Sequence, residues 1–387
     1  MKLIYLQSHP IQYNAPFFSK LTNSGINLEV IFFSKEGMNE SLDVQFNTTF
    51  KWDIPLLDNY NYSFINNNSF KPSIHNGFLG LLNMGIIKKL KNTPPSIVVV
   101  PGWHYASYII AIIAAKFFGH KLVLRGESPL SQELLKSKLI LSFRKILFKY
   151  FLFKILDHAF YIGEQNKSFY VHYGLKENKL LFVPYSVDNE RFQNYNKSFI
   201  NERGIFKKKL GIKTGTKIIL FSGKYISKKR PLDLLMAFHY SNISNSILVL
   251  MGEGELRQEL EKYILENNLN DKVILTGFIN QTLISNYYSI ADIFVMCSGP
   301  GETWGLSVNE AMNFGLKIIV SDITGCGDDL VRLGKTGWIF PYGNVTELTN
   351  KINIALLDTE IKKFDIIDQI NIYSYLTCVN SIKSILN

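Results

Sequence analysis

Short apolar runs alternate with longer stretches of helical periodicity along almost the whole chain. The runs are rich in valine and isoleucine, which predicts strands, and the stretches between them are long enough for crossover helices. Strands that alternate with helices in this way form parallel sheets of the α/β class. Because the runs are continuously apolar, each predicted sheet should be covered by helices on both faces.

The predicted strands fall into two series, which a polar, turn-rich stretch over 186–217 separates. The first series comprises residues 2–6, 28–33, 97–100, 121–124, 158–162 and 180–183. The second series comprises residues 218–222, 247–251, 273–276, 293–296, 318–320 and 338–340. This arrangement predicts an α/β protein with two doubly wound, Rossmann-like domains facing across a ligand cleft at the carboxyl ends of their strands.

Domain boundaries follow from the two series. We expect an N-terminal, acceptor-side domain over 1–190, a linker over 191–215 and a second, nucleotide-binding domain over 216–370. The last segment, 371–387, has helical periodicity and is expected to pack back toward the N-terminal domain. A chain of 387 residues, of which 47% are hydrophobic, has ample material for two packed cores.

Basic residues are concentrated in one part of the chain. The formal charge is +10, yet residues 51–250 contain 29 basic and 11 acidic residues, whereas the remainder contains 13 and 21. Such a region favours an anionic partner, and the candidates are nucleic acid, an acidic membrane surface and a phosphorylated substrate. Nucleic acid is disfavoured, because the basic clusters at 207–209 and 228–230 have no interleaved aromatic residues for base stacking.

Other sequence features argue against several protein classes. The first ten residues lack the apolar core of a signal peptide, so export is not expected. The widely spaced Cys297, Cys326 and Cys378 are typical of a reduced cytosolic protein. No Asp-x-Asp and no zinc-binding pattern occurs, so neither a metal ion nor another cofactor is expected. No apolar run reaches the ~20 residues that span a bilayer.

The segment 135–156 contains six lysines and arginines and no acidic residue. Lys138, Ser142, Lys145 and Lys149 form a narrow polar stripe on a helical projection, and most other positions are large and apolar. This pattern predicts an amphipathic helix that lies in the interface of an anionic membrane. The alternative is a helix with one apolar face in the core and a solvated basic stripe.

The most informative stretch runs from Ser298 to Met312. It follows a predicted strand, turns through glycines and a proline, and enters a helix near Leu306, where clustered backbone N–H groups can bind a phosphate. Glu302 precedes these amides and Glu310 follows them. A carboxylate accepts two hydrogen bonds from a vicinal diol, so the pair suits a sugar and a ribose joined by diphosphate. The alternative is a solvated loop charge and an ordinary helix-surface glutamate.

Two further loops complete the predicted nucleotide site. The loop that begins at Gly223 follows the first strand of the second domain, where doubly wound folds bind phosphate. Its Lys224 and Lys229 could neutralise the charge that develops on a diphosphate leaving group without a metal ion. The loop Gly252-Glu253-Gly254 ends the next strand and is expected to form one wall of the pocket.

These pieces together resemble family 4 (group 1) retaining glycosyltransferases of the GT-B fold. The resemblance includes the glycine and two lysines of the first loop, Gly252-Glu253-Gly254 and the stretch from Glu302 to Glu310, in the family's order. It continues through 318–322 and 337–340 and so covers most of the second domain. The first domain resembles the family more loosely.

The resemblance implies a role for each matching residue. Glu302 would bind the transferred sugar, Glu310 the ribose, and the two lysines the diphosphate. His104 resembles the family's position near the anomeric carbon, and the alternative is a packed, structural imidazole. The catalytic candidates are His104, Glu302, Lys224 and Lys229. The donor-binding candidates are Gly223, Lys224, Lys229, Gly252, Glu253, Glu302, Thr303, Trp304, Gly305, Leu306 and Glu310.

Two positions depart from the family's pattern. Lys224 stands where the family usually has an arginine, which keeps the charge but loses bidentate geometry. The loop over 7–13, after the first strand, contains no glycine, so its side chains are expected to make the acceptor or donor contacts. The acceptor-side candidates are His9, Gln12, Tyr13, Arg125 and Glu127.

The resulting hypothesis is a retaining hexosyltransferase, cytoplasmic and peripheral on the inner face of the cell membrane. It would move a sugar from a UDP- or GDP-sugar to a saccharide acceptor, expected to be lipid-linked, in bacterial surface polysaccharide biosynthesis. The alternatives are a nucleotide-sugar epimerase or hydrolase on the same fold and a non-catalytic membrane-binding subunit.

Overall fold

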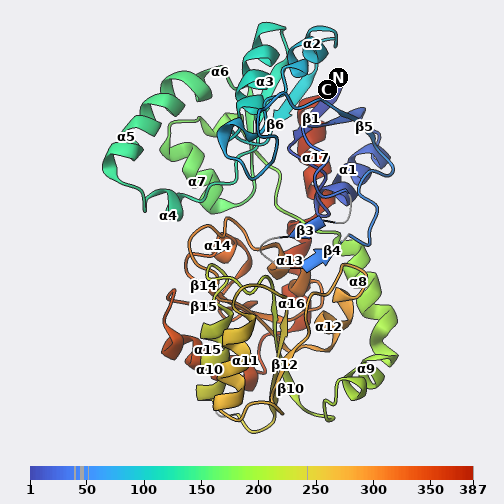
Figure 1. The fold of residues 1–387 in the computed structure, drawn as a ribbon, viewed down its shortest axis with the longest axis vertical. Coiled ribbons are helices and arrows are strands. Elements are labelled where there is room, and N and C mark those ends of the chain that lie inside the picture. The colour runs from blue at the N-terminus through green and yellow to red at the C-terminus, as the bar shows by residue number, and fades with distance from the viewer. Residues whose placement is uncertain (39–40, 44–47, 51, 242, 387) are drawn as a thin grey trace. The chain divides into compact units, whose positions relative to one another are not determined.

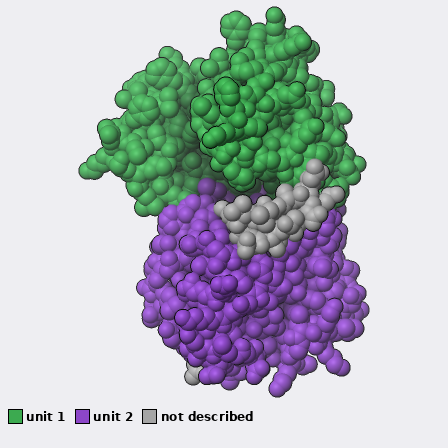
Figure 2. Space-filling view, viewed as in Figure 1, with its two compact units in different colours: residues 1–40, 54–185, 375–387 green, residues 41–53, 186–374 purple. Residues whose placement is uncertain are grey.

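The computed structural model describes residues 1–38, 41–43, 48–50, 52–241 and 243–386, which form two compact units (Figure 1, Figure 2). Unit 1 comprises Met1–Glu40, Ile54–Tyr185 and Tyr375–Asn387. Unit 2 comprises Ser41–Asp53 and Ser186–Ser374. The short segment 41–53 therefore belongs with the second half of the chain, whereas the sequence pattern placed it in the N-terminal domain.

Unit 1 is built around a seven-stranded parallel sheet in the order β5-β2-β1-β6-β7-β8-β9. Alternate residues of each central strand enter different cores: Ile4 and Val98 lie in one, Tyr5 and Val99 in the other. Both faces of the sheet are thus covered, as the continuous apolar runs predict. The strands are β1 (Leu3–Gln7), β2 (Leu28–Phe32), β5 (Asn61–Phe64), β6 (Ile97–Val100), β7 (Lys121–Leu124), β8 (His158–Tyr161) and β9 (Leu180–Phe182).

The helices of unit 1 follow the strands in sequence, as in other doubly wound folds. They are α1 (Asn14–Asn23), η1 (Phe78–Gly80), α2 (Gly85–Lys91), α3 (Ala106–Phe117), α4 (Leu130–Glu133), α5 (Lys138–Ile146), the π-helical η2 (Leu147–Leu152), α6 (Phe153–Ile155), α7 (Glu164–His172), η3 (Glu177–Lys179) and α17 (Tyr375–Leu386). The C-terminal α17 lies beside α1 (Figure 1), and the hydroxyl of Tyr375 donates to the Tyr13 carbonyl at 3.2 Å. The last helix therefore packs onto unit 1.

Unit 2 contains a six-stranded parallel sheet in the order β12-β11-β10-β13-β14-β15. Its strands are β10 (Lys217–Ser222), β11 (Ser246–Met251), β12 (Val273–Leu275), β13 (Ile293–Met296), β14 (Lys317–Ser321) and β15 (Gly337–Phe340). Its helices are α8 (Asn189–Ser198), η4 (Phe199–Asn201), α9 (Arg203–Lys209), α10 (Pro231–Ser241), α11 (Arg257–Glu266), α12 (Ile284–Ile290), α13 (Leu306–Met312), α14 (Gly327–Leu330), α15 (Val345–Leu357) and α16 (Lys363–Ile372).

The two Rossmann-like α/β units confirm the predicted fold class, and each predicted strand is present within about two residues of its expected ends. The segment expected to be a linker, 191–215, contains most of α8 and all of α9. Asp188 caps α8, since its carboxylate accepts from the Arg191 N–H at 3.0 Å. The edge strand β5 and the hairpin of β3 (Ser41–Asp43) and β4 (Thr48–Phe50) were not predicted.

Candidate active site

The donor-binding candidates lie on three loops at one edge of the sheet of unit 2. Gly223 follows β10, Gly252 follows β11, and Glu302 lies between β13 and α13. These strands are neighbours in the order β11-β10-β13, so their carboxyl ends meet at the same edge. This is where doubly wound sheets bind their ligands.

Backbone contacts join the first two of these loops. Gly223 donates its N–H to the Met251 carbonyl at 3.0 Å, and Gly252 donates to the Gly277 carbonyl at 3.0 Å. Gly252 has a φ of 154°, and a Cβ atom there would lie 1.9 Å from the Gly223 carbonyl oxygen. The close approach of the two loops therefore requires glycine at this position.

Glu302 is buried and forms an ion pair with Lys229. The neighbouring Lys228 donates its ammonium to the Gly301 carbonyl at 3.2 Å. Burial acts to raise the pKa of Glu302, but the charges of Lys229 and Lys228 outweigh it and hold this pKa below its usual value. Glu302 is consequently an ionised carboxylate at neutral pH, held at a fixed position beside two ammonium groups.

Lys228 also belongs to this cluster, although it is not among the donor-binding candidates predicted from the sequence. Burial lowers the pKa of its ammonium, Lys229 and Lys224 lower it further, and Glu302 opposes them. Lys224 therefore lies close enough to Lys228 to act on it electrostatically. The cluster presents excess positive charge at the edge of the sheet where the phosphate loop was predicted.

Helix α13 begins at Leu306, as the sequence predicts. Its N-cap, Gly305, has a left-handed φ of 108°, and a Cβ atom there would lie 2.7 Å from the sulfur of Met296. The preceding Trp304 is buried, and its indole N–H donates to the Asn309 side chain at 2.8 Å. The Trp304 side chain thus packs inside unit 2, with its indole N–H bonded to Asn309.

Glu310 lies inside α13 and is 1% exposed. The hydroxyl of Tyr288 in α12 donates to its carboxylate at 2.8 Å. Glu310 is therefore a buried, oriented carboxylate and not the helix-surface residue that its spacing alone would suggest. No spacing signal links Tyr288 to it, because the two residues come from different helices.

A loop after β14 supports the Glu302 loop from behind. Gly325 donates its N–H to the Glu302 carbonyl at 3.2 Å, and Cys326 donates to the Trp304 carbonyl at 3.1 Å. A Cβ atom at Gly325 would lie 1.9 Å from the Thr303 carbonyl oxygen. Gly325 is thus a structural requirement of the site that the sequence interpretation missed, although its place in Thr324-Gly325-Cys326-Gly327 marks a turn.

The acceptor-side candidates gather within unit 1. The loop that holds His9, Gln12 and Tyr13 follows β1, and the loop with Arg125 and Glu127 follows β7. The intervening strand β6 precedes His104, and the sheet order β1-β6-β7 brings all three loops to one edge. The sheet of unit 1 therefore presents its own cluster of candidates, at the carboxyl ends of its own strands.

A buried polar network holds the β7 loop. The Arg125 guanidinium is buried and lies 5.3 Å from the ring centroid of Tyr185. The Tyr185 hydroxyl donates to Glu127. Burial raises the pKa of Glu127, although the Tyr185 hydrogen bond and the Arg125 charge oppose the change. Glu127 is thus a carboxylate with an unusual proton affinity at the edge of the sheet.

The two histidine candidates of unit 1 differ in their surroundings. His104 is partly exposed, and its ring centroid lies 4.3 Å from that of Tyr105, whereas Trp103 packs against Phe148. Burial lowers the pKa of His104 and lowers that of His9 to about 4, so both imidazoles are neutral at pH 7. The His9 ring is 2.9 Å from the Ser8 hydroxyl. The roles of these residues remain predictions.

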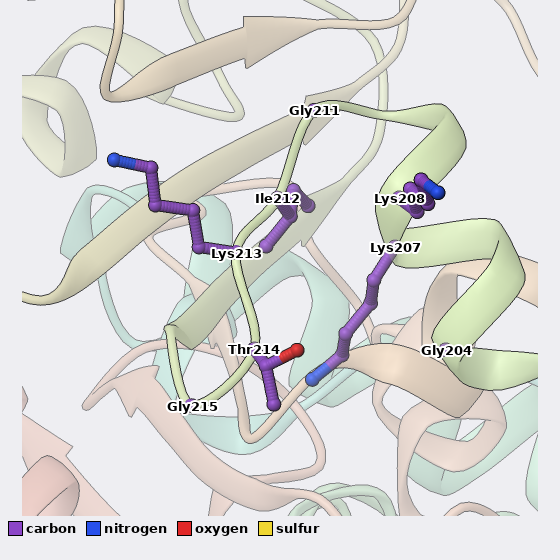
Figure 3. A pocket seen from close by; sticks show the side chains of 8 residues that line it. All are labelled: Gly204, Lys207, Lys208, Gly211, Ile212, Lys213, Thr214 and Gly215. Atoms are coloured by element: carbon purple, nitrogen blue, oxygen red, sulfur yellow. The ribbon is translucent and has the colours of Figure 1, made fainter.

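A separate depression of about 430 Å³ contains none of the candidate residues. It lies at α9 and the turn before β10, at the amino end of that strand. The side chains of Lys207, Lys208 and Lys213 point in different directions (Figure 3), so their ammonium groups do not converge on one anion. Its lining residues are Gly204, Lys207, Lys208, Gly211, Ile212, Lys213, Thr214 and Gly215.

In the part of the chain that the structure describes, no group of three or more His, Cys, Asp or Glu residues could hold a metal ion. None of the described helices is both long and apolar enough to cross a bilayer. The expectation that no metal or other cofactor is needed remains a prediction.

The segment that contains the donor-binding candidates matches a known protein family. Residues 202–368 match the family model of the glycosyl transferases group 1. The alpha-monoglucosyldiacylglycerol synthase of Acholeplasma laidlawii is 29% identical over 169 residues, which are 42% of this chain and 41% of that protein. An uncharacterised glycosyltransferase of Methanocaldococcus jannaschii is 28% identical over 142 residues, or 35% of each chain. The chain thus matches only about two fifths or less of the length of these relatives.

The fold comparison extends over both units. The crystal structure of Anabaena HepE in complex with UDP-glucose superposes with a TM-score of 0.71 and covers 99% of this chain and 98% of that one. The two sequences are 16% identical, so this likeness concerns the fold. Together with the family model, it confirms the resemblance to group 1 glycosyltransferases and their GT-B fold.

Proposed function

We propose that this chain, a group 1 glycosyltransferase by its residues 202–368, moves a sugar with retention from a UDP- or GDP-sugar to a saccharide acceptor. The observation that carries the proposal is the cluster of Glu302, Lys228 and Lys229 at the carboxyl edge of the sheet, followed along the chain by the buried Glu310 of α13. An ionised carboxylate beside ammonium groups suits a neutral sugar that is joined to an anionic diphosphate.

The lysines would act on the leaving group. The acceptor hydroxyl would attack the anomeric carbon on the face from which the diphosphate departs. The bond from that carbon to the diphosphate oxygen breaks, the hydroxyl proton passes to the departing diphosphate oxygen, and negative charge collects on the nucleotide. Ammonium groups that are already in place stabilise this charge without reorganisation. Glu302 would fix the sugar hydroxyls, and its pairing with Lys229 keeps the carboxylate oriented before the donor binds.

UDP is the first donor nucleotide to test, since the structurally similar HepE was crystallised with UDP-glucose. A ligand that binds only the folded state stabilises it, by ~2.7 kcal/mol at a hundredfold excess over its Kd. We therefore expect UDP or UDP-glucose to raise the melting temperature by several degrees in a thermal-shift assay. GDP and GDP-mannose serve as the matched pair with the other base, and no shift with any of the four would refute the donor site.

An incubation without acceptor separates this proposal from its alternatives. A nucleotide-sugar epimerase or hydrolase consumes the donor alone, whereas a transferase releases UDP at a substantial rate only when acceptor is added. A non-catalytic subunit does neither. These three outcomes can be distinguished by chromatography of the nucleotide sugar.

We further propose that the acceptor is lipid-linked and that the protein lies on an anionic membrane through residues 135–156. Helix α5 is at the periphery of unit 1 (Figure 1), and it contains no buried residue. Leu139 is 82% exposed and Phe143 66% exposed. The following η2 also exposes large hydrophobic residues, among them Tyr150 and Phe151. An exposed apolar surface of this kind is typical of an interaction site.

An ion pair and a cation–π contact attach the segment 135–156 to the rest of unit 1. Arg144 forms an ion pair with the buried Glu133 at 2.9 Å, and Tyr173 donates its hydroxyl to the same carboxylate at 2.7 Å. The Arg144 guanidinium also lies 5.0 Å from the ring centroid of Phe148. Helix α5 thus turns an arginine inward and its apolar side chains outward, which is the reverse of a helix on a water-facing surface. This favours the membrane over the alternative of a core-facing apolar side.

Vesicle binding tests the membrane proposal. We expect the protein to float with vesicles that contain anionic phospholipid at low ionic strength and to bind less as salt is added, because the basic residues of 135–156 contribute electrostatic attraction. Neutral phosphatidylcholine vesicles are the matched comparison. Equal binding to both vesicle types at low salt would contradict a charge-dependent contact.

One relative supports a lipid-linked acceptor, because its name describes a glycolipid synthase. The Acholeplasma laidlawii protein is named a synthase of a glucosyl diacylglycerol, which is a glycolipid. We therefore propose bacterial surface polysaccharide or glycolipid assembly as the setting, at the inner face of the cell membrane.

A further inference from the structure

The segment 41–53 belongs to unit 2, although the residues before and after it in the sequence belong to unit 1. In sequence it lies between β2 and β5, which pair with each other in the sheet of unit 1. In space it belongs to unit 2, where β3 and β4 form a short antiparallel ladder with Ser41 opposite Phe50. We call residues 41–53 the arm.

The end of the arm contacts the loop that follows β12. The Trp52 ring lies 6.2 Å from the Phe278 ring in an edge-to-face arrangement. The Asp53 carboxylate accepts the N–H of Thr282 at 3.1 Å and also its hydroxyl. Aromatic pairs of this geometry are attractive beyond their buried area, and a hydrogen bond to a carboxylate is stronger than one between neutral groups. The two contacts therefore fix both ends of the loop over 278–282.

The same loop is continuous with the candidate donor site. Gly277, immediately before Phe278, accepts the N–H of Gly252 at 3.0 Å. A Cβ atom added to Gly277 would lie 3.4 Å from the Glu253 carboxylate, so the loop after β12 lies directly beside the wall formed by Gly252 and Glu253. A shift of this loop would be transmitted to that wall through the backbone contact.

A second clamp holds the loop from α8. The Arg191 guanidinium donates to the Gln281 side chain at 3.1 Å and to its carbonyl at 3.4 Å. Gln281 is buried, so this clamp is part of the body of unit 2. The arm thus contacts Phe278 and Thr282, which lie on either side of Gln281 in the sequence, and α8 holds Gln281 itself.

We propose that Trp52 and Asp53 are positioning residues of the donor site, which hold the loop over 277–282 in the conformation that receives the nucleoside of the nucleotide sugar. This inference rests on the proposed function. Neither residue would touch the reacting atoms. Preorganising a loop lowers the ordering cost of binding, so the effect should appear in donor affinity rather than in the rate of the bound complex.

The test is calorimetric titration with UDP, combined with steady-state kinetics for UDP-glucose. We expect Trp52→Ala to weaken UDP binding by about tenfold and to raise the KM for the donor while leaving kcat nearly unchanged. Trp52→Phe, which keeps an aromatic edge, should restore most of the affinity. Phe70→Ala removes a fully exposed aromatic residue of unit 1 and should bind UDP as the unchanged protein does.

The outcomes separate this inference from the proposed function. If the unchanged protein binds neither UDP nor GDP, the proposed function is refuted. If it binds UDP and Trp52→Ala has the same Kd, the positioning role alone is refuted, whatever happens to the melting temperature. Asp53→Ala, at an exposed position, is the second variant should Trp52→Ala unfold, and an unchanged Kd there is equally contradictory.

Discussion

Glu302→Gln should lower kcat/KM for sugar transfer by roughly 10³-fold, the magnitude typical of removing one preorganised electrostatic contact. The amide keeps the shape of the side chain, but it removes the negative charge beside Lys229 and Lys228 and accepts fewer hydrogen bonds from sugar hydroxyls. UDP should still bind, because the proposed diphosphate contacts come from the lysines and not from this carboxylate. UDP release in the presence of acceptor measures the rate, and calorimetry with UDP measures the retained affinity.

The control for this variant is Glu255→Gln. Glu255 is an exposed carboxylate on the loop after β11, where it accepts the Ser227 hydroxyl at 3.1 Å. Its loss changes the net charge by the same amount and should leave transfer unchanged. A Glu302→Gln enzyme with normal kcat/KM would show that the sugar is held elsewhere.

The pH dependence of stability tests whether Glu302→Gln has its effect through the ion pair. Because the pKa of Glu302 is lowered on folding, its ionised form stabilises the native state above the unfolded pKa, and that contribution is lost as the pH falls through the folded pKa. The melting temperature of the variant should therefore be lower at pH 7 and should fall less on acidification. Parallel melting curves for the two proteins from pH 7 to pH 3 would exclude a stabilising pair.

Replacing Leu139, Phe143 and Ile146 together by glutamate should abolish binding to anionic vesicles. Each large apolar side chain gains about 1.5–3 kcal/mol on burial, so losing three corresponds to at least a 10³-fold fall in partitioning. Since α5 contains no buried residue, the fold should be retained. Vesicle flotation measures binding, and the transfer rate to a short soluble acceptor should persist while that to a lipid-linked acceptor falls.

A matched triple variant in unit 2 shows whether vesicle binding depends on α5 itself or only on the change in charge and hydrophobicity. Leu265, Leu357 and Phe364 are equally exposed apolar residues of unit 2, and their replacement by glutamate makes the same change in charge and hydrophobicity. This variant should float with vesicles as the unchanged protein does. Loss of binding in both triple variants, or in neither, would rule out α5 as the membrane contact.

Most of the fold could be predicted from local pattern. Continuous apolar runs marked the central strands of both sheets, because burial on two faces leaves no polar position in a strand. The edge strand β5, with the sequence Asn61-Tyr62-Ser63-Phe64, escaped notice because an edge strand is half exposed and mixes polar with apolar residues. The arm was also missed, since three-residue strands carry too little periodicity.

Part of the candidate site could likewise be predicted from the sequence, and part could not. Glu302, Lys229 and the start of α13 lie within loops whose glycines and charges are readable along the chain. The sequence by itself thus determined which loops form the candidate site, because turns and helix starts depend on neighbouring residues. Only the tertiary structure decided that Tyr288 binds Glu310, that Gly325 supports the Glu302 loop and that Trp304 is packed.

Helix α5 shows the same division. Its apolar and basic residues were plain in the sequence, but the direction in which each faces was not. The direction was decided by the ion pair between Arg144 and Glu133, two residues on different helices. Spacing along a chain specifies which side chains share a face, whereas partners distant in sequence are chosen by the packing of whole elements, which has no local signature.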